Sequence, residues 1–265
     1  MANRKSLPIA LTIAGSDSGG GAGIQADLKT FAALGVHGTS VITCLTAQNP
    51  RRVLRVEPCS PRMLGRQLEA VFSELPPAAI KTGLLFSAQN IRLVATFLKN
   101  SNDGRHLVVD PVMVSTSGTR LLARDAMTVL QKQLLPLATL LTPNLDEAAI
   151  LAEAPINAVE MMGVAARIIH SRYGCAVLLK GGHLRDAKEA VDILFDGKNE
   201  WRLACPFIRG VATHGTGCTY SAAICAALAR GKSLPQAAQI GKDYITQAIA
   251  GSRRIGAHYT LGPVG

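Results

Sequence analysis

The chain has 265 residues, of which 48% are hydrophobic, and its formal net charge at pH 7 is +10. Length and hydrophobic content exclude a disordered chain and predict one large domain, residues 1–265, whose core needs neither disulfides nor metal. No apolar run is long enough to span a membrane and the first residues lack a signal-peptide pattern, so we expect a cytoplasmic protein without membrane contact.

The positive charge raises the question of a nucleic-acid partner. Lysine and arginine are scattered along the chain, and aromatic residues make up only 4% of it. A basic stripe interleaved with stacking side chains is therefore missing, and we expect no nucleic acid but a general field that attracts anionic substrates. The six cysteines form no Cys-x-x-Cys pair, which argues against zinc or thioredoxin-like chemistry.

The start of the chain predicts a strand, a glycine-rich loop and a helix. Residues 7–14 are an apolar run, residues 15–23 are rich in glycine, and residues 24–34 are amphipathic with a helical period. This order is the layout of an anion or small-ligand site in an α/β protein. A dinucleotide fold needs an acidic residue after the next strand, but none lies between Asp27 and Glu57, which argues against a nicotinamide enzyme.

Apolar runs and helical patterns alternate along the rest of the chain. This alternation predicts an α/β fold in three layers, with a mostly parallel central sheet, helices on both faces and some antiparallel strands toward an edge. Asp196-Gly197 between two strand-like runs predicts a hairpin, and two helices are expected after Gly217. The expected strands are 39–45, 78–83, 106–110, 138–141, 176–180, 190–195 and 200–205; the expected helices are 61–72, 89–98, 124–134, 145–153 and 159–172.

Polar residues follow most of the expected strands. Ligands of such sheets bind beyond the carboxyl ends of the strands, so these side chains should gather at one site. Each residue alone is better explained as a turn or helix cap. Together they offer carboxylates for magnesium, a lysine for phosphate and an amide for a substrate ring. They are Gly15, Asp17, Gln48, Gly83, Asp110, Asn144, Glu147 and the run Lys180, Gly181, Gly182 and His183.

Residues 214–219, His-Gly-Thr-Gly-Cys-Thr, lead into a run of small residues that predicts a helix. A helix N-terminus presents unpaired N–H groups, and glycines let a polyanion approach them closely, so we expect an anion hole here. The field there would favour a Cys218 thiolate, with a pKa below the free value of about 8.5. A base beside an anion hole predicts phosphoryl transfer to a hydroxyl group. The alternative is a turn before a core helix with a buried cysteine.

Segments spread along nearly the whole chain match one family in order. Residues 14–30 form its long N-terminal block, residues 46–49 continue it, and residues 110–113, 142–148, 180–183 and 214–219 are later blocks. The chain thereby resembles the hydroxymethylpyrimidine and phosphomethylpyrimidine kinases of thiamine biosynthesis, which are ribokinase-like. The resemblance implies ATP-dependent phosphorylation of 4-amino-5-hydroxymethyl-2-methylpyrimidine, and then of its monophosphate to the diphosphate.

The resemblance also implies a role for individual residues. Cys218 would take the proton of the hydroxymethyl group, and Gln48 with Asp27 would hold the aminopyrimidine edge. Mg²⁺ would accompany ATP, the co-substrate. The implied catalytic residues are Cys218, Gly217, Thr216 and Lys180; the substrate-binding residues are Gly15, Asp27, Gln48 and Leu84; the nucleotide-binding residues are Asn144, Lys180 and Thr216; and the metal ligands are Asp110 and Glu147.

Several alternatives stay open at this point. Leu84 stands where several relatives carry methionine, so a pyridoxal or pyridoxine kinase with the same site is the second interpretation. Many ribokinase-like relatives carry Asp in place of Cys218, which favours the pyrimidine-kinase branch over sugar kinases. A ligand-binding protein without catalysis would not need the phosphate-binding residues. The relatives suggest a homodimer, and a requirement for a monovalent cation is left open.

Overall fold

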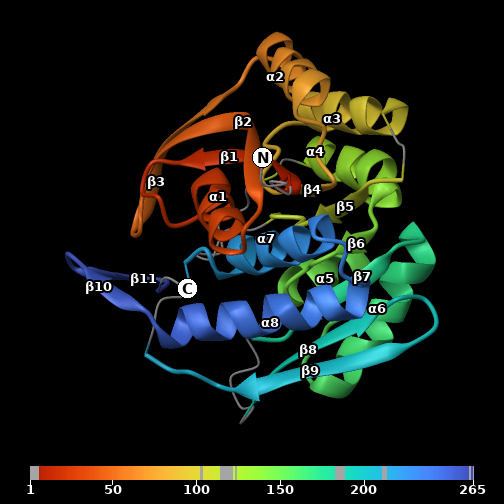
Figure 1. Ribbon diagram of the computed structural model, residues 1–265. Helices are drawn as coiled ribbons and strands as arrows, with labels where there is room; N and C mark the ends of the chain where they lie inside the picture. Colours follow the sequence, from red (N-terminus) through yellow and green to blue (C-terminus); the bar gives the residue numbers. More distant parts are fainter. Residues whose placement is uncertain are drawn as a thin grey trace.

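The computed structural model describes residues 6–101, 104–113, 122, 124–182, 189–210, 214–262 and 264. Its main sheet has nine strands, which are β1 Ile9–Asp17, β2 His37–Asn49, β3 Arg52–Pro58, β4 Ala79–Thr82, β5 His106–Val109, β6 Leu140–Leu141, β7 Ala176–Lys180, β8 Glu189–Phe195 and β9 Glu200–Pro206. Their order across the sheet is β3-β2-β1-β4-β5-β6-β7-β8-β9 (Figure 1).

The middle of the sheet is parallel from β2 to β7. Antiparallel strands close both edges, with β3 beside β2 at one edge and the β8–β9 hairpin beside β7 at the other. The predicted mostly parallel sheet is therefore confirmed, and antiparallel pairing occurs at two edges rather than one. The β3 strand escaped prediction because most of its side chains are exposed, so it has no apolar alternation to detect.

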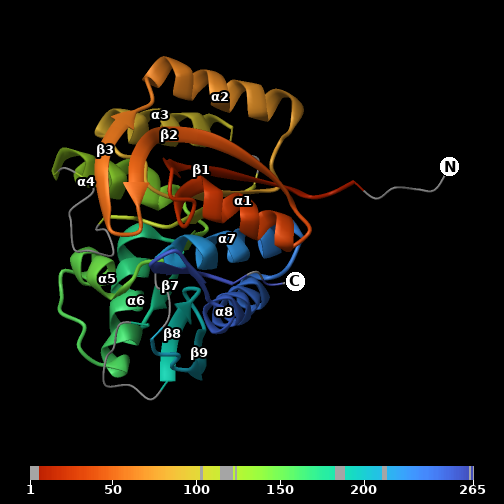
Figure 2. The ribbon, with the colours of Figure 1, turned by 90° about the vertical axis from the view of Figure 1, so that its left-hand side faces the viewer.

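Helices cover both faces of this sheet (Figures 1 and 2). One layer consists of α1 Gly23–Ala33, α7 Thr216–Ala229 and α8 Leu234–Ala250; the other consists of α2 Pro61–Glu74, α3 Ala88–Asn100, α4 Arg124–Val129, α5 Leu145–Ala152 and α6 Val159–Tyr173. The three-layer prediction is thus confirmed. Among the residues that the structure describes, no helix has the length and apolar character needed to cross a membrane.

The predicted helix over residues 124–134 changes type before it ends. It is α-helical to Val129, continues as a π-turn over Leu130–Leu134 and finishes as a 3₁₀ turn, Leu135–Leu137. Pro136 explains the end, because proline lacks the N–H that would continue an α-helical ladder. The wider turn brings Leu134 and Leu135 into the core, where both are fully buried.

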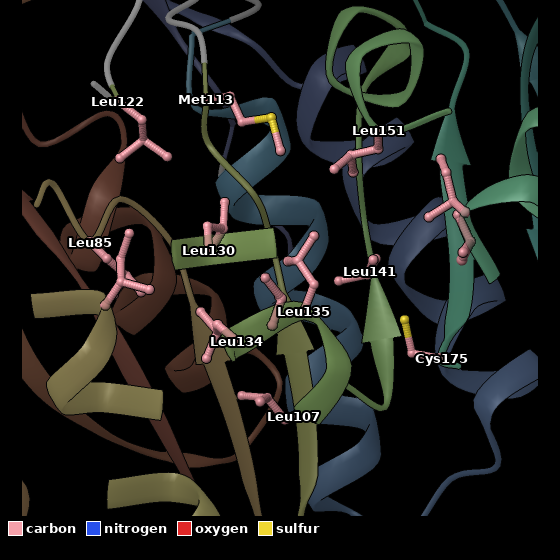
Figure 3. Close-up of a cluster of buried hydrophobic side chains, with 14 of the residues drawn as sticks. Leu85, Leu107, Met113, Leu122, Leu130, Leu134, Leu135, Leu141, Leu151 and Cys175 are labelled. Atoms are coloured by element: carbon pink, nitrogen blue, oxygen red, sulfur yellow. The ribbon is translucent and has the colours of Figure 1, made fainter. Parts of the chain in front are cut away.

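Two apolar cores lie on the two faces of the sheet. Alternate residues of a strand face opposite sides, so Leu107 and Val109 of β5 pack under α2–α6 while Val108 packs under α1, α7 and α8. Figure 3 shows the first of these cores, where Leu107 lies among Leu134, Leu135 and their neighbours. Burial on both faces explains why the parallel strands are continuous apolar runs in the sequence.

A second, two-stranded sheet follows α8, in a region for which the sequence predicted no strand. It pairs β10 Arg253–Ile255 with β11 His258–Thr260. The turn between them uses Gly256 at a φ of 53°, a conformation that favours glycine. Strands of three largely exposed residues carry no periodic signal, which is why the sequence did not reveal them.

Truncation of a buried leucine to alanine should lower the free energy of unfolding more than the same truncation of an exposed leucine. Leu134→Ala removes a fully buried side chain and should lower the free energy of unfolding by about 2–5 kcal/mol, because a cavity replaces packed atoms. Leu7→Ala is the matched control, since Leu7, which precedes β1, is 62% exposed, and it should change stability by less than about 0.5 kcal/mol. Urea unfolding of both variants measures the difference; equal losses would contradict this placement of the core.

Candidate active site

A cavity of about 950 Å³ opens beyond the carboxyl ends of the parallel strands. The chain leaves β1 toward α1 on one face of the sheet, whereas it leaves β4 toward α3 on the opposite face. Connections that diverge in this way open a crevice at the strand ends, where ligands of doubly wound sheets bind. The walls come from the ends of β1, β2, β4, β5 and β7, from the first turns of α5 and α7, and from the segment after β9.

The glycine-rich turn after β1 is organised by one carboxylate, that of Asp17. Its Oδ1 accepts the N–H of Gly19 at 2.8 Å, and its Oδ2 accepts the N–H groups of Gly21 at 3.1 Å and Ala22 at 2.8 Å. Burial by itself would raise the pKa of Asp17, but hydrogen bonds from His214 and from the backbone outweigh it and lower the pKa. Asp17 is therefore an anion that shapes the turn.

A second glycine-rich turn, before α7, packs directly on the first. Gly215 has a φ of 80°, and a Cβ placed on it would overlap the carbonyl oxygen of Gly21. Only glycine combines that conformation with so close an approach of two backbones. Contact between the turns brings the N-terminus of α7 to the cavity, with Thr216, Gly217 and Cys218 on its wall.

The α7 N-terminus faces a cation, as the predicted anion hole requires. A Cβ built on Gly217 would lie 3.3 Å from Nζ of Lys180, so backbone and ammonium group are neighbours. Lys180 donates to Oδ1 of Asp110 at 3.0 Å. Burial would lower the pKa of Lys180, but Asp110 and Glu147 outweigh burial and raise it. Lys180 is thus held as a cation, and the structure brings the predicted Asp110, Lys180 and Gly217 together.

Asn144 and Glu147 form a reciprocal cap at the start of α5. Asn144 Oδ1 accepts the N–H of Glu147 at 2.9 Å, and Glu147 Oε2 accepts the N–H of Asn144 at 3.0 Å. The other oxygen of Glu147 accepts the N–H of Met113 at 3.1 Å. Burial has the largest effect and raises the pKa of Glu147. The negative charge of Asp110 raises it further, while the positive charge of Lys180 acts in the opposite direction. Glu147 therefore serves as a helix cap as well as part of the cavity wall.

The donor set fits a magnesium ion held together with a nucleotide. Mg²⁺ is usually bound by one or two carboxylates, with water and substrate phosphates as the other ligands. Asp110 and Glu147 both line the cavity and repel one another electrostatically. Each Glu147 oxygen uses only one of its lone pairs for the backbone. Within the described residues there is no cluster of three His, Cys, Asp or Glu side chains, so these residues do not form an all-protein cage.

The opposite end of the cavity carries three of the predicted substrate contacts, Gly15, Gln48 and Leu84. The amide Nε2 of Gln48 lies 3.4 Å from Nε2 of His214. Gly15 packs on Cys44, whose Sγ would lie 2.8 Å from a Cβ at that position, so the cavity floor is the bare backbone. A flat apolar floor beside an amide suits a heteroaromatic ring.

Val53 and Val56 add an apolar wall that the sequence did not reveal. Both belong to β3 and line the cavity. Cross-strand pairing places Val53 opposite Gln48, and Val56 opposite Thr46. Since β3 itself was not predicted, these contacts had no signal in the sequence.

Asp27 does not lie where it was expected. Its carboxylate is fully buried, both of its oxygens accept from Lys81 Nζ at 2.8 Å, and the Thr12 hydroxyl donates to it at 2.6 Å. It is absent from the cavity wall, whereas Lys81 is part of it. In this structure Asp27 therefore supports Lys81 and does not line the cavity. The one signal for Lys81 was a lysine inside an apolar strand.

Cys218 differs from the expected thiolate. Burial raises the pKa of its thiol to about 11, although the Lys81 ammonium and the N–H of Gly23 act in the opposite direction. The helix N-terminus was the basis for expecting a lowered pKa, but withdrawal from water has the larger effect here. Cys218 is at the predicted place and is a thiol in the free protein.

An apolar groove extends the cavity beyond Lys180 toward α8. It offers a surface for a flat, largely apolar group such as a nucleotide base, adjoining the phosphate end. The sequence had not singled out these residues, because apolar side chains in a loop and a helix look like core. They are Phe207, Ile208, Ile245, Thr246 and Ile249. His183, the last residue of the predicted block 180–183, lies outside the described residues.

The profile of the phosphomethylpyrimidine kinase family matches residues 17–264. The chain belongs to this family. It is 49% identical over 257 residues to the hydroxymethylpyrimidine/phosphomethylpyrimidine kinase of Rhizobium meliloti, covering 97% of this chain and 96% of that protein. It is also 50% identical over 254 residues, or 96% of this chain, to the thiamine biosynthesis bifunctional protein of Geobacter sulfurreducens, of which it spans about half, 51%.

A solved structure of another vitamin kinase has the same fold. The ADP complex of Bacillus subtilis pyridoxal kinase superposes with a TM-score of 0.89 at 36% identity, covering 97% of this chain and 98% of that one. The resemblance seen in the sequence and the ribokinase-like fold class are thereby confirmed. The roles of the individual site residues stay predictions.

The raised pKa of Cys218 predicts slow alkylation. Only the thiolate reacts, and its fraction grows as the pH rises toward the pKa, here about 11. At about pH 8, iodoacetamide should therefore modify Cys218 in the folded protein roughly a hundredfold more slowly than in the urea-unfolded chain, where the thiol has its usual pKa of about 8.5. Peptide mass spectrometry reads out Cys218 separately from the other cysteines. Faster reaction in the folded protein would restore the thiolate expectation.

Proposed function

We propose that this protein transfers the γ-phosphoryl group of ATP to the hydroxymethyl oxygen of 4-amino-5-hydroxymethyl-2-methylpyrimidine, and then a second phosphoryl group to that phosphate ester. One observation carries this proposal: the α7 N-terminus and Lys180 form an anion site in the same cavity that presents the amide of Gln48. The close relative from Rhizobium meliloti, which bears both kinase activities in its name, supports it. Residues 1–265 then act as a single kinase domain.

The proposed transfer depends mainly on position and charge. Phosphoryl transfer passes through a loose transition state in most analyses, so a kinase contributes alignment and neutralisation of phosphate charge. The N–H groups of Gly217 and Cys218 would bind phosphate oxygens together with Lys180, and Asn144 and Thr216 would contact the nucleotide. The apolar groove beside α8 would take the base. Mg²⁺, held by Asp110 and Glu147, would supply further positive charge on the phosphates.

Cys218 would receive the proton that leaves the hydroxymethyl group. The thiol form of the free protein means that this role requires ionisation after the substrates bind. Lys81 acts in that direction, because its ammonium group lowers the pKa of Cys218 against the effect of burial. The thiol must release its own proton to solvent before the thiolate can accept the proton of the hydroxymethyl group.

A second candidate function is phosphorylation of pyridoxal or pyridoxine at the same site. The observation in its favour is the 0.89 TM-score with Bacillus subtilis pyridoxal kinase. Identity is higher with the Rhizobium pyrimidine kinase, at 49% against 36%, which favours the pyrimidine. Leu84 on the cavity wall is the residue that we expect to discriminate between the two substrates, because it lies beside the expected place of the ring.

We also propose a homodimer that works in the cytoplasm. The β2–β3 hairpin exposes Leu45 by 55% and Leu54 by 61%, an apolar surface at a sheet edge that a second copy would cover. The six cysteines are all free, as expected in a reducing compartment.

A substrate panel separates the two candidate functions. With ATP and magnesium, kcat/KM should be highest for the hydroxymethylpyrimidine or its monophosphate, and at least tenfold lower for pyridoxal, because the Gln48 amide would match the ring nitrogen and amino group of the pyrimidine. Formation of ADP in a coupled assay gives the rates. A higher kcat/KM for pyridoxal would assign the protein to vitamin B6 instead.

The proposed role of Cys218 predicts a strong loss of turnover on its removal. Cys218→Ala should lower kcat by about 10²–10⁴, the usual contribution of a general base, while ATP still binds. Cys225→Ala is the matched control, since Cys225 is a fully buried cysteine further along α7, and its kcat should stay near that of the wild type. Near-normal turnover of Cys218→Ala would remove Cys218 from the mechanism.

A further inference from the structure

Two segments that are far apart in the sequence meet at the carboxylate of Asp17. The glycine-rich turn after β1 donates three backbone N–H groups to it. His214, 197 residues away, places its Nε2 3.3 Å from Oδ2. The Asp17 side chain is only 4% exposed and that of His214 is 30% exposed, so the carboxylate end of this contact lies out of water.

The end of β2 is attached to the same turn. The Ser18 hydroxyl donates to the carbonyl oxygen of Gln48 at 2.8 Å, and the N–H of Gln48 donates back to that hydroxyl at 2.8 Å. The side chain of Gln48 in turn approaches Nε2 of His214. The turn after β1, the end of β2 and the residue before Gly215 therefore move together if they move at all.

The negative charge of Asp17 also decides which way His214 bonds. An Nε2 that carries a hydrogen donates to Asp17, and it then cannot accept from the Gln48 amide. The opposite tautomer would place a lone pair against a carboxylate. Asp17 thus favours the protonated Nε2, and the amide N–H of Gln48 is left to bond a ligand in the cavity.

The contact between the turn after β1 and the residues His214 and Gly215, here called the joint, leaves no space for a side chain on either glycine. A Cβ on Gly21 would lie 2.8 Å from Cδ2 of His214, and one on Gly215 would overlap the oxygen of Gly21. Behind the joint, Ile255, Tyr259 and Thr260 of the β10–β11 hairpin line a small cavity of about 20 Å³.

We propose that Asp17 is a positioning residue that couples the two substrate subsites. Through the first turn it sets Ala22, Gly23 and Gln48 on the pyrimidine side of the cavity, and through His214 it sets Gly215 and the anion hole on the ATP side. Binding of either ligand then orders a joint that the other also needs, so each raises the affinity of the protein for the other. The identity of the ligands rests on the proposed function.

Isothermal titration calorimetry, with an ATP analogue that cannot react, measures this coupling directly. The hydroxymethylpyrimidine is titrated into the protein with and without a non-hydrolysable ATP analogue and magnesium. The wild type should bind the pyrimidine roughly 5–150-fold more tightly when the analogue is present, the usual range of such coupling. In Asp17→Asn this factor should fall to about 1–2, whatever the change in affinity for each ligand alone.

A matched control comes from the β8–β9 turn. There Asp196 Oδ1 accepts the N–H groups of Lys198 and Asn199, the same kind of carboxylate-to-turn contact, at an exposed place outside the cavity. Asp196→Asn should keep the coupling of the wild type. If Asp17→Asn does not fold, His214→Asn removes the contact with Asp17, together with the approach of His214 to Gln48, and should abolish the coupling as well.

Two results overturn the proposal. One is a folded Asp17→Asn or His214→Asn protein that keeps the full coupling factor; the other is a wild type without coupling. Repeating the titrations with pyridoxal keeps the two claims apart. A wild type that binds pyridoxal and not the pyrimidine would refute the substrate assignment, whereas the loss or survival of coupling in Asp17→Asn would still decide the role of Asp17.

Discussion

The close approach of the α7 N-terminus to the ends of β5 and β7 is the contact on which the site depends. It requires a helix that can lie almost against the sheet, and α7 meets this need with small residues. Ala222, Ala223 and Ala226 are fully buried, and hardly any of α7 beyond its first turn reaches water. Bulkier side chains would lift the helix, and the N–H groups of its first turn would no longer face Lys180. The helix that completes the core is thus also the helix whose N-terminus lines the cavity beside Lys180.

Buried ion pairs hold the strand ends around this contact. Lys81–Asp27 lies at β4, Lys180–Asp110 joins β7 to the end of β5, and Lys242–Asp192 joins α8 to β8. The last of these also fixes the residue after Lys180, because Asp192 Oδ1 accepts the N–H of Gly181 at 2.9 Å. Pairs of this kind contribute little net stability, since desolvation offsets attraction. Their arrangement around one cavity indicates that they maintain its charges and geometry.

Much of this site was predictable because parallel strands all end at the same edge. Asp110, Asn144 and Lys180 follow different apolar runs, and the rule that such ends meet is enough to place them at one site from the amino-acid order alone. The glycines of the two turns also indicated close backbone approaches. Strands and helices were predicted correctly where one-sided burial gives the sequence a hydrophobic period. The strands β3, β10 and β11 were missed, because none of their residues is buried.

The failures within the site have one physical cause, which is burial. Asp27 was expected to bind the substrate, but its partner Lys81 is 54 residues away and no local pattern links them. The thiol of Cys218 was expected to ionise at a helix N-terminus, yet its desolvation depends on α1, β4 and β5 packing around it. The contact of Asp17 with His214 was hidden from the sequence as well, because 197 residues separate the two.

The most direct test is a crystal structure with a non-hydrolysable ATP analogue, magnesium and the hydroxymethylpyrimidine bound together. The phosphates should lie against the N–H groups of Gly217 and Cys218 and the Nζ of Lys180, with the base in the groove of Ile245 and Ile249. The pyrimidine ring should lie between Gly15 and the Gln48 amide, its hydroxymethyl oxygen beside Cys218 Sγ and in line with the γ-phosphorus. Phosphates bound to the glycine-rich turn after β1, or a ring outside the reach of Gln48, would contradict this account of the site.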